Sequence, residues 1–143
     1  MATEIFFDGL CEPQPGGIGT YGYVIYSGGE KIREHCGFIG KGKGMTNNIA
    51  EYTAVVEALK WAQAHGLLKG EAIIKGDSQL VIRQLQGSYR IKSKTSKKFF
   101  PVISKITAGE NVRYEWVPRE ENSEADCLSK RAHEDYAMKM VRG

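Results

Sequence analysis

The sequence predicts an α/β fold in which one mixed sheet carries helices on its faces. Three strand-like segments joined by glycine-rich turns open the chain. From residue 48 the apolar residues recur at steps of three and four, the period of an amphipathic helix, and strand and helix patterns then alternate. An order of three strands, helix, strand, two helices, strand and helix is typical of a single sheet covered by helices.

The three opening strands are predicted at Glu4–Phe7, Ile18–Tyr26 and Lys31–Ile39, which are rich in aromatic and β-branched residues. The segments between them, Cys11–Gly17 and Ser27–Gly29, concentrate proline, glycine and serine and are predicted to be turns. Because short turns join antiparallel neighbours, we expect these strands to form a meander.

The first long helix is predicted from about Asn48 to His65, with Gly66 as its left-handed C-terminal residue. Residues Glu71–Lys75 form a compact apolar run that predicts a buried strand. The tripeptide Gly76–Ser78 then opens a second helix, which we expect to stop near Gly87.

A third helix is predicted over Phe99–Ile106, on the condition that Pro101 lies in its first turn, where a missing N–H is tolerated. The alternation over Val112–Trp116 predicts a fifth strand, and a last helix is expected to be capped by Asn122 or Ser123. The sequence contains no repeat and no linker, so we expect one domain over residues 1–143.

The composition is that of an ordinary soluble protein, with 41% apolar and 26% charged residues. No stretch approaches the roughly 18 apolar residues of a membrane span, and the acidic start lacks the basic residues of a secretory signal. We therefore expect a cytoplasmic monomer with no membrane association and no obligate protein partner.

Cysteine and histidine do not form a metal-binding pattern. Cys11, Cys36 and Cys127 make no CxxC pair, and the three histidines lack the spacing of a zinc site. The odd number of cysteines favours reduced, partly buried thiols over a disulfide. The net charge of +3 is too small to identify a polyanionic partner.

Four acidic residues lie near predicted element ends. Asp8 follows the first strand, Glu51 is expected in the first turn of the first long helix, Asp77 follows the fourth strand, and Asp126 lies in the last helix. Each has a structural alternative: a turn for Asp8, a helix cap for Asp77, a first-turn charge for Asp126, and a capping box with Asn48 for Glu51.

Taken together, the four acids favour a metal site. Asp8 and Asp77 end two strands expected to be neighbours, which places their carboxylates side by side at one edge of the sheet. Adjacent anions repel and raise each other's pKa unless a cation lies between them. Oxygen-only ligands favour a hard ion such as Mg²⁺ or Mn²⁺, the ions used in phosphoryl-transfer chemistry.

Four sequence segments carry a family resemblance, and they are IFFDG, TNNIAEYTAVVEAL, IKGDSQLVIRQL and WVPREENSEADCLSKRA. In this order and spacing, over nearly the whole chain, they resemble the ribonuclease H type 1 family. The TNNxxE, GDSQ and NxxAD motifs make the resemblance specific. It implies a ribonuclease H-like five-stranded mixed sheet, with three antiparallel strands followed by two parallel strands, and endonucleolytic cleavage of the RNA strand in an RNA/DNA hybrid.

The resemblance also implies the ligand set and the chemistry. Asp8, Glu51, Asp77 and Asp126 would hold two divalent ions, Mg²⁺ or Mn²⁺, with Asp8 between the two metal sites. One ion would activate a water, and the other, about 4 Å away, would stabilise the leaving 3' oxygen. The products would carry a 5' phosphate and a 3' hydroxyl.

Substrate contacts are implied at small polar residues. Thr46, Asn47, Asn48 and Gln79 match family positions that touch minor-groove edges and phosphates, and Gly9 is expected to leave room for the RNA backbone. For Thr46 and the two asparagines, helix capping is an equally weighted alternative.

Between Tyr89 and Phe99 the chain carries basic residues and no acid, namely Arg90, Lys92, Lys94, Lys97 and Lys98. Neutralisation of substrate phosphates, with Arg90, Lys92 and Lys94 as candidate contacts, is favoured over a merely solvated helix face.

The chain departs from the bacterial form of the family in two respects. It lacks the tryptophan-bearing basic protrusion, which Lys92 to Lys98 replace in part. It also lacks the mobile histidine before the last acid, for which Arg119 is the nearest candidate. Its VPRExNxxAD pattern is similar to that of the compact archaeal-like and retroelement-associated branch.

Three other functions stay open. A related exonuclease or resolvase would use similar acids, although Asp8-Gly9-Leu10 lacks the Asp-x-Glu of such exonucleases. A non-catalytic hybrid-binding or polymerase-tethered domain is disfavoured because all four acids are present. An α/β binding module would use the acids as helix caps. Whether the chain works alone or within a reverse transcriptase is open.

Overall fold

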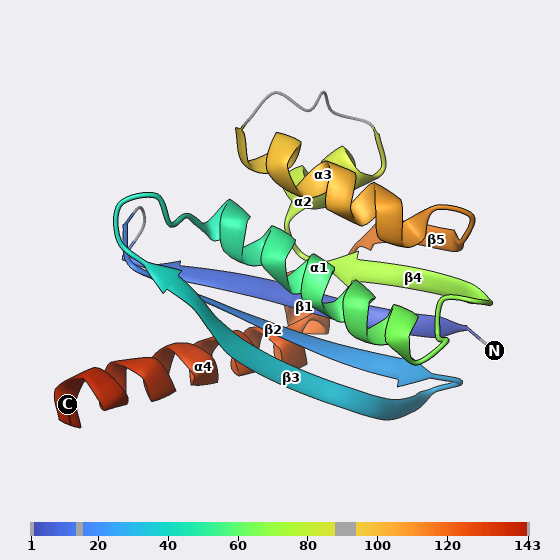
Figure 1. Cartoon of the computed structure of the whole chain (residues 1–143). Helices are drawn as coiled ribbons and strands as arrows, with labels where there is room; N and C mark the ends of the chain where they lie inside the picture. The colour runs from blue at the N-terminus through green and yellow to red at the C-terminus, as the bar shows by residue number, and fades with distance from the viewer. Residues whose placement is uncertain (1, 14–15, 88–93, 143) are drawn as a thin grey trace.

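Five strands form one mixed sheet, as the resemblance predicts, and their order is β3-β2-β1-β4-β5. The computed structural model describes residues 2–13, 16–87 and 94–142 (Figure 1). β1 pairs antiparallel with β2, and β2 with β3, whereas β4 runs parallel to both β1 and β5. The strands are β1 (Thr3–Glu12), β2 (Ile18–Ser27), β3 (Glu30–Lys41), β4 (Glu71–Gly76) and β5 (Asn111–Trp116).

Helices cover both faces of the sheet. Figure 1 shows α4 along one face, and α1 along the other with α2 and α3 beside it. The helices are α1 (Asn47–Ala64), α2 (Gln79–Leu85), α3 (Lys94–Thr107) and α4 (Ser123–Arg142), and a short 3-10 helix, η1 (Arg119–Glu121), precedes α4. The main core fills the space between the sheet and α1 and includes Ile5, Phe7, Ile25, Ile74, Val55 and Leu59. No helix in the described part of the chain is apolar and long enough to cross a membrane.

β1 is longer than predicted, and this changes the position of Asp8. The prediction that Asp8 follows the first strand is wrong, because β1 continues to Glu12. The antiparallel ladder with β2 extends along the whole strand, whereas the parallel pairing with β4 ends at Phe6 opposite Lys75. Asp8 therefore lies inside β1, two residues beyond its last pairing with β4.

α1 begins one residue earlier than predicted and is capped by Thr46, whose Oγ1 accepts a hydrogen bond of 3.2 Å from the Ile49 N–H. Glu51 is thus the fifth residue of the helix, so its predicted place in the first turn is wrong. The capping-box alternative, in which Asn48 would cap the helix and Glu51 would lie three residues later, is wrong because Thr46 is the N-cap. Gly66 has a positive φ of 70° after the helix, as predicted.

α3 begins well before the predicted Phe99, so Pro101 lies inside the helix and not in its first turn. A proline there removes the hydrogen bond to the carbonyl of residue 97. Pro101 is exposed, and the helix is held on both sides of it by buried Ser96 and by Ile103 and Ile106. Tertiary packing therefore decides the helix boundary against the local preference.

The three cysteines are free, as expected, but their burial differs. Cys11 is buried, Cys36 is half-buried and Cys127 is exposed. The expectation of partial burial is thus wrong for Cys127, which lies on the outer side of α4.

Two glycines let the helices approach the sheet backbone closely. A Cβ on Gly9 in β1 would lie 2.3 Å from the Ala50 carbonyl carbon and the Glu51 nitrogen of α1. On the other face, a Cβ on Gly22 in β2 would lie 2.7 Å from Leu128 Cβ and 2.8 Å from the Ala125 carbonyl oxygen of α4. The close distance between each helix and the sheet therefore depends on a glycine, which has no side chain at the contact.

We expect Gly22→Ala to lower the free energy of unfolding by roughly 1–3 kcal/mol, because α4 must move away from β2 to admit the methyl group. Chemical denaturation followed by circular dichroism measures this loss. Gly44→Ala is the matched control, since nothing lies within 4 Å of a Cβ there. Its effect should stay within about 1 kcal/mol. Equal losses in the two variants would contradict the close packing of α4 on β2.

Candidate active site

Four carboxylates from four elements line one cavity of about 440 Å³. Asp8 comes from β1, Glu51 from α1, Asp77 from the residue after β4, and Asp126 from the first turn of α4. The parallel neighbours β1 and β4 bring Asp8 and Asp77 to the same end of the sheet, as predicted. The residues that line the cavity are Asp8, Gly9, Leu10, Cys11, Glu12, Asn47, Glu51, Asp77, Arg119, Asp126 and Lys130.

Asp8 is the most buried of the four acids, with 9% of its surface exposed. The pKa of its carboxyl is raised from 3.8 to about 8, mainly by burial and also by the negative charge of Asp77, a hydrogen bond to Asp126 and the charge of Glu51. The Gly9 N–H donates to Asp8 Oδ1 over 3.0 Å. The Asp8 carboxyl therefore holds a proton more tightly than an exposed aspartate does.

Glu51 is in a similar position. The pKa of its carboxyl is raised from 4.5 to about 7, mainly by burial; a hydrogen bond from Ser78 lowers it in part, and the charge of Asp77 raises it. Its Oε2 atom is buried and has no hydrogen-bond partner among the described residues. A buried, unpaired carboxylate oxygen is costly unless a cation or a donor reaches it.

Asn122 and Trp116 hold the Asp77 segment in place. The Asn122 Nδ2 group donates to the Phe7 carbonyl over 2.9 Å and to Asp77 Oδ2 over 3.3 Å. The Trp116 indole N–H donates to the Asp77 carbonyl over 3.1 Å. These bonds tie β1, the loop after β4, the end of β5 and the start of α4 into one frame.

Two cationic side chains share the cavity with the acids. Lys130 lies one turn after Asp126 on α4, and its Nζ is 3.0 Å from Asp126 Oδ2. Arg119 is exposed and also lines the cavity, where the sequence predicted a functional role for it. Glu12 also lines the cavity, so its acidic side chains outnumber these two cations.

The donor set fits a hard divalent cation, although the ligands are not in place. Among the described residues, no three acidic, histidine or cysteine side chains already lie in an arrangement that would hold an ion. In the metal-free fold Asp8 holds a proton more tightly than an exposed aspartate, because burial and the neighbouring acids disfavour its charged form. An ion would replace that proton, and Glu51 Oε2 would supply a further unpaired oxygen.

The predicted substrate contacts lie in different places. Asn47 lines the cavity, and its Oδ1 accepts from the Cys11 N–H over 2.8 Å. Thr46 caps α1, so its capping alternative is confirmed. Asn48, in the first turn of α1, and exposed Gln79, the first residue of α2, do not line the cavity.

Gly9 requires a correction. The sequence predicted that its missing side chain makes room for RNA, but the Cβ direction is filled by the α1 backbone at Ala50 and Glu51. Gly9 lines the cavity with its backbone, and its lack of a side chain serves helix packing.

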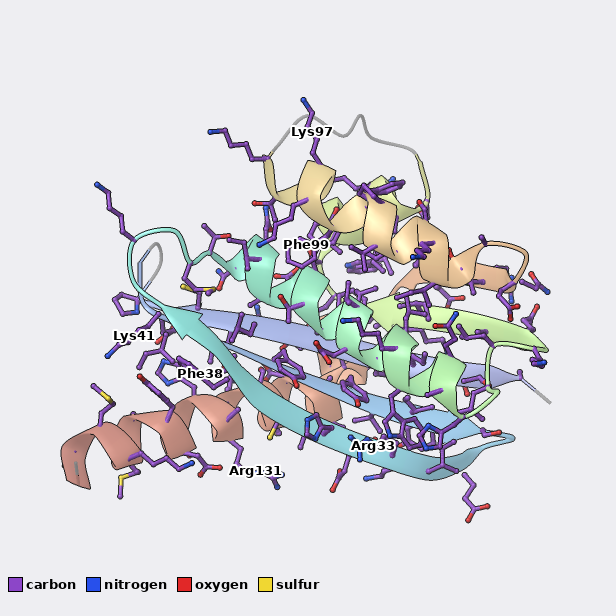
Figure 2. All side chains as sticks on the ribbon, viewed as in Figure 1. Arg33, Phe38, Lys41, Lys97, Phe99 and Arg131 are labelled. Atoms are coloured by element: carbon purple, nitrogen blue, oxygen red, sulfur yellow. The ribbon has the colours of Figure 1, made fainter. Side chains whose placement is uncertain are left out.

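The basic segment lies partly within the described residues. Arg90 and Lys92 fall outside them. Lys94, Lys97 and Lys98 are exposed near the start of α3, and Figure 2 shows Lys97 projecting from that helix. Lys94 does not line the cavity.

Sequence reasoning missed three residues of the site. Asn122 was considered only as a helix cap, Ser78 only as part of a helix start, and Lys130 was not considered. For Asn122 and Lys130, the available signal was spacing from Asp126 on a predicted helix: one lies four residues before it and the other four residues after it. For Ser78, adjacency to Asp77 was the only signal.

Comparison with known proteins extends the sequence evidence. A family model described as reverse transcriptase-like matches residues 6–132. The bifunctional protein Rv2228c of Mycobacterium tuberculosis is 32% identical over 135 residues, which cover 92% of this chain and 35% of that protein. Ribonuclease HI of Halobacterium salinarum is 33% identical over 135 residues, covering 93% of this chain and 65% of that protein. The chain thus spans about one third to two thirds of the length of these curated relatives.

Solved structures agree with this family. LC11-RNase H1, crystallised with an RNA/DNA hybrid, superposes with a TM-score of 0.86 and 32% identity over 94% of this chain and 99% of its own. RNase H1 from the halophilic archaeon Halobacterium salinarum gives a TM-score of 0.84 and 31% identity, with the same coverage. Since the family model and these superpositions cover most of the chain, it belongs to the ribonuclease H type 1 family.

Proposed function

We propose that this chain is a divalent-metal-dependent endonuclease that cleaves the RNA strand of RNA/DNA hybrids. The observation that carries the proposal is the convergence of Asp8, Glu51, Asp77 and Asp126 on one cavity in a fold of the ribonuclease H family. The relative LC11-RNase H1, which was crystallised with an RNA/DNA hybrid, supports the choice of substrate.

The four carboxylates would hold two ions, Mg²⁺ or Mn²⁺, with Asp8 contributing to both. Bound in pairs, such ions lower the pKa of a water nucleophile and stabilise the leaving 3' oxygen, which gives a 5' phosphate and a 3' hydroxyl. The chain itself supplies the acidic cavity and fixes the positions of the carboxylates. Asn122 fixes Asp77 by donating hydrogen bonds to both Asp77 Oδ2 and the Phe7 carbonyl.

The cationic residues of the cavity would act on the substrate. Arg119 is exposed beside the acids, and it is the nearest candidate to replace the mobile histidine of the bacterial form of the family. We infer that it binds the phosphate or assists product release. Asn47 lines the same cavity and is placed to contact the nucleic acid. The lysines at the start of α3 would neutralise phosphates further along the duplex.

Asp8→Asn and Asp77→Asn should each reduce hybrid cleavage by several orders of magnitude while the chain stays folded, because each removes one charged ligand without changing its shape. Initial rates on a labelled RNA/DNA hybrid with Mg²⁺ measure the effect. Duplex RNA, duplex DNA and a chelator complete the substrate panel.

Glu134→Gln is the matched control for these variants, since Glu134 is exposed on α4 and does not line the cavity. It should retain the parental rate. Near-normal Mg²⁺-dependent cleavage by both aspartate variants would refute the assignment, and cutting of blunt duplex DNA would favour a related exonuclease.

Metal should stabilise the protein more at pH 8 than at pH 5. The raised pKa values of Asp8 and Glu51, about 8 and 7, mean that the metal-free fold keeps their stabilising contribution in full below about pH 4 and loses it as pH rises through both values. Mg²⁺ binds the deprotonated carboxylates, so the stabilisation that it adds grows as the pH rises through these pKa values. At a hundred times Kd the gain is about 2.7 kcal/mol, which is several degrees in Tm.

Thermal melts with Mg²⁺ and with chelator, at both pH values, test this linkage. The difference between the Tm with Mg²⁺ and the Tm with chelator, taken at each pH, removes the contribution of groups that do not respond to metal. Asp8→Asn should show a smaller Mg²⁺ gain and a weaker pH trend. Equal Mg²⁺ gains at pH 5 and pH 8 would argue against a carboxylate site.

Hybrid binding should weaken steeply with salt, and the double variant Lys94→Ala/Lys97→Ala should reduce the slope. Each lost phosphate contact lowers the slope of log K against log salt by about 0.9. Fluorescence anisotropy over a salt series gives both slopes. Lys60→Ala/Lys69→Ala, which removes two exposed lysines elsewhere, should leave the slope unchanged. An unchanged slope in the Lys94/Lys97 variant would remove this segment from the binding surface.

A further inference from the structure

A surface away from the cavity combines an exposed aromatic stack with lysines. We call it the β3/α4 patch and define it by Phe38, Lys41, Tyr136 and Lys139. Phe38 is 44% exposed, and its ring lies flat against Tyr136, with centroids 4.1 Å apart and planes 8° apart. Figure 2 shows Phe38 and Lys41 close together where β3 passes α4.

The patch is positively charged. Lys41 Nζ lies 5.8 Å from the Tyr136 ring centroid, and Lys139 lines a shallow depression of about 180 Å³ beside the stack. Asp135 is the acidic side chain lining that depression, and exposed Lys43 follows in the next loop. An exposed Phe38 ring, stacked on half-buried Tyr136 and flanked by lysines, matches the chemistry of single-stranded nucleic acid, whose bases stack and whose phosphates need cations.

The patch is connected to the cavity along α4. Lys130 lines the cavity, and one turn later His133 Nε2 lies 3.3 Å from the carbonyl of Glu12, which also lines it. Tyr136 follows in the next turn. Ten residues of helix separate Asp126 from Tyr136, a rise of roughly 15 Å, which a few nucleotides can span.

A second connection runs through the loop between β3 and α1. Lys41 ends β3, and Lys43 precedes Thr46 and cavity-lining Asn47 by only a few residues. The Gly42 N–H donates to the Gly17 carbonyl over 3.1 Å, and Gly16 donates to the Met45 carbonyl over 3.0 Å, so this loop is fixed against the start of β2. The backbone that carries Lys43 is thus held in place between the end of β3 and the start of α1.

We propose that the β3/α4 patch binds single-stranded RNA that continues beyond the hybrid, on the strand whose phosphate enters the cavity. This inference rests on the proposed function for its choice of strand. Strand continuity selects RNA over DNA, because the scissile strand is the one that the carboxylates and Lys130 would hold. Phe38 and Tyr136 offer the stacking platform, and Lys41 and Lys139 meet the backbone.

The first test is direct binding without catalysis. A labelled single-stranded RNA oligonucleotide is titrated with the protein in chelator and followed by anisotropy. Phe38→Ala should weaken binding by roughly five- to hundredfold, the effect of losing one stacked base. Lys41→Ala should weaken it and make it less sensitive to salt. Ile32→Ala, which removes another exposed apolar residue of β3, and Lys60→Ala are the matched controls and should bind normally.

The second test uses cleavage of hybrids with equal duplex length that are blunt or carry an RNA or DNA overhang at either end. Phe38→Ala and Lys41→Ala should raise KM for an RNA-overhang hybrid and leave kcat, and all constants for the blunt hybrid, unchanged. Thermal melts verify folding. If Phe38→Ala is destabilised, Lys41→Ala decides alone, because its side chain is exposed.

Unchanged RNA binding by both variants, equal KM changes on blunt and overhang hybrids, or an effect confined to DNA overhangs would overturn the inference. So would sedimentation showing that the parental chain is a dimer and that Phe38→Ala is a monomer, because the patch would then be a contact between two copies. Failure of the nuclease proposal is separately visible, since no hybrid would then be cut by the parental chain while RNA binding in chelator is still measured.

Discussion

Electrostatic repulsion within one enclosed cavity is the constraint on which the structure of the site depends. Four carboxylates lie together, and burial keeps Asp8 and Glu51 from ionising as they would in water. The fold resists this repulsion by rigid placement: β1 and β4 are paired, α1 is packed on bare backbone at Gly9, and α4 is packed on bare backbone at Gly22. Without such packing, the acids would relax into solvent. The repulsion and burial raise the pKa values of Asp8 and Glu51, and a bound cation would relieve the repulsion in place of protons.

Local sequence patterns predicted the elements and their order because these depend on short-range preferences. The positive φ at Gly66 and Gly87, the strand ending before Asp77 and the alternation of the meander are all local properties. The arrangement of the five-stranded mixed sheet and the assignment of the four acids to two metal ions needed the family motifs in addition. The convergence of Asp8 and Asp77 followed from the rule that parallel strands end at one edge, even though the end of β1 was misplaced.

The errors arose where distant parts of the chain decide the outcome. Nothing in the sequence around Asp8 continues the strand pattern, and the ladder with β2 supplies the missing stabilisation up to Glu12. Pro101 interrupts a helix that buried Ile103 and Ile106 still hold. Asn122 could not be assigned, since its partners are a carbonyl and a carboxylate far away in sequence. Side-chain networks of this kind have no periodicity, so they become visible only with coordinates.

The Asn122 side chain has a consequence for synthesis of the protein on the ribosome. It joins the Phe7 carbonyl and Asp77 Oδ2 to the residue just before α4. A nascent chain that has released β1 to β5 still lacks this clamp and the fourth acid on α4. Because the contact between Asn122 and the Phe7 carbonyl spans 115 residues, it forms late, as non-local contacts do. A chain without α4 therefore carries no complete site, because it lacks both this clamp and Asp126.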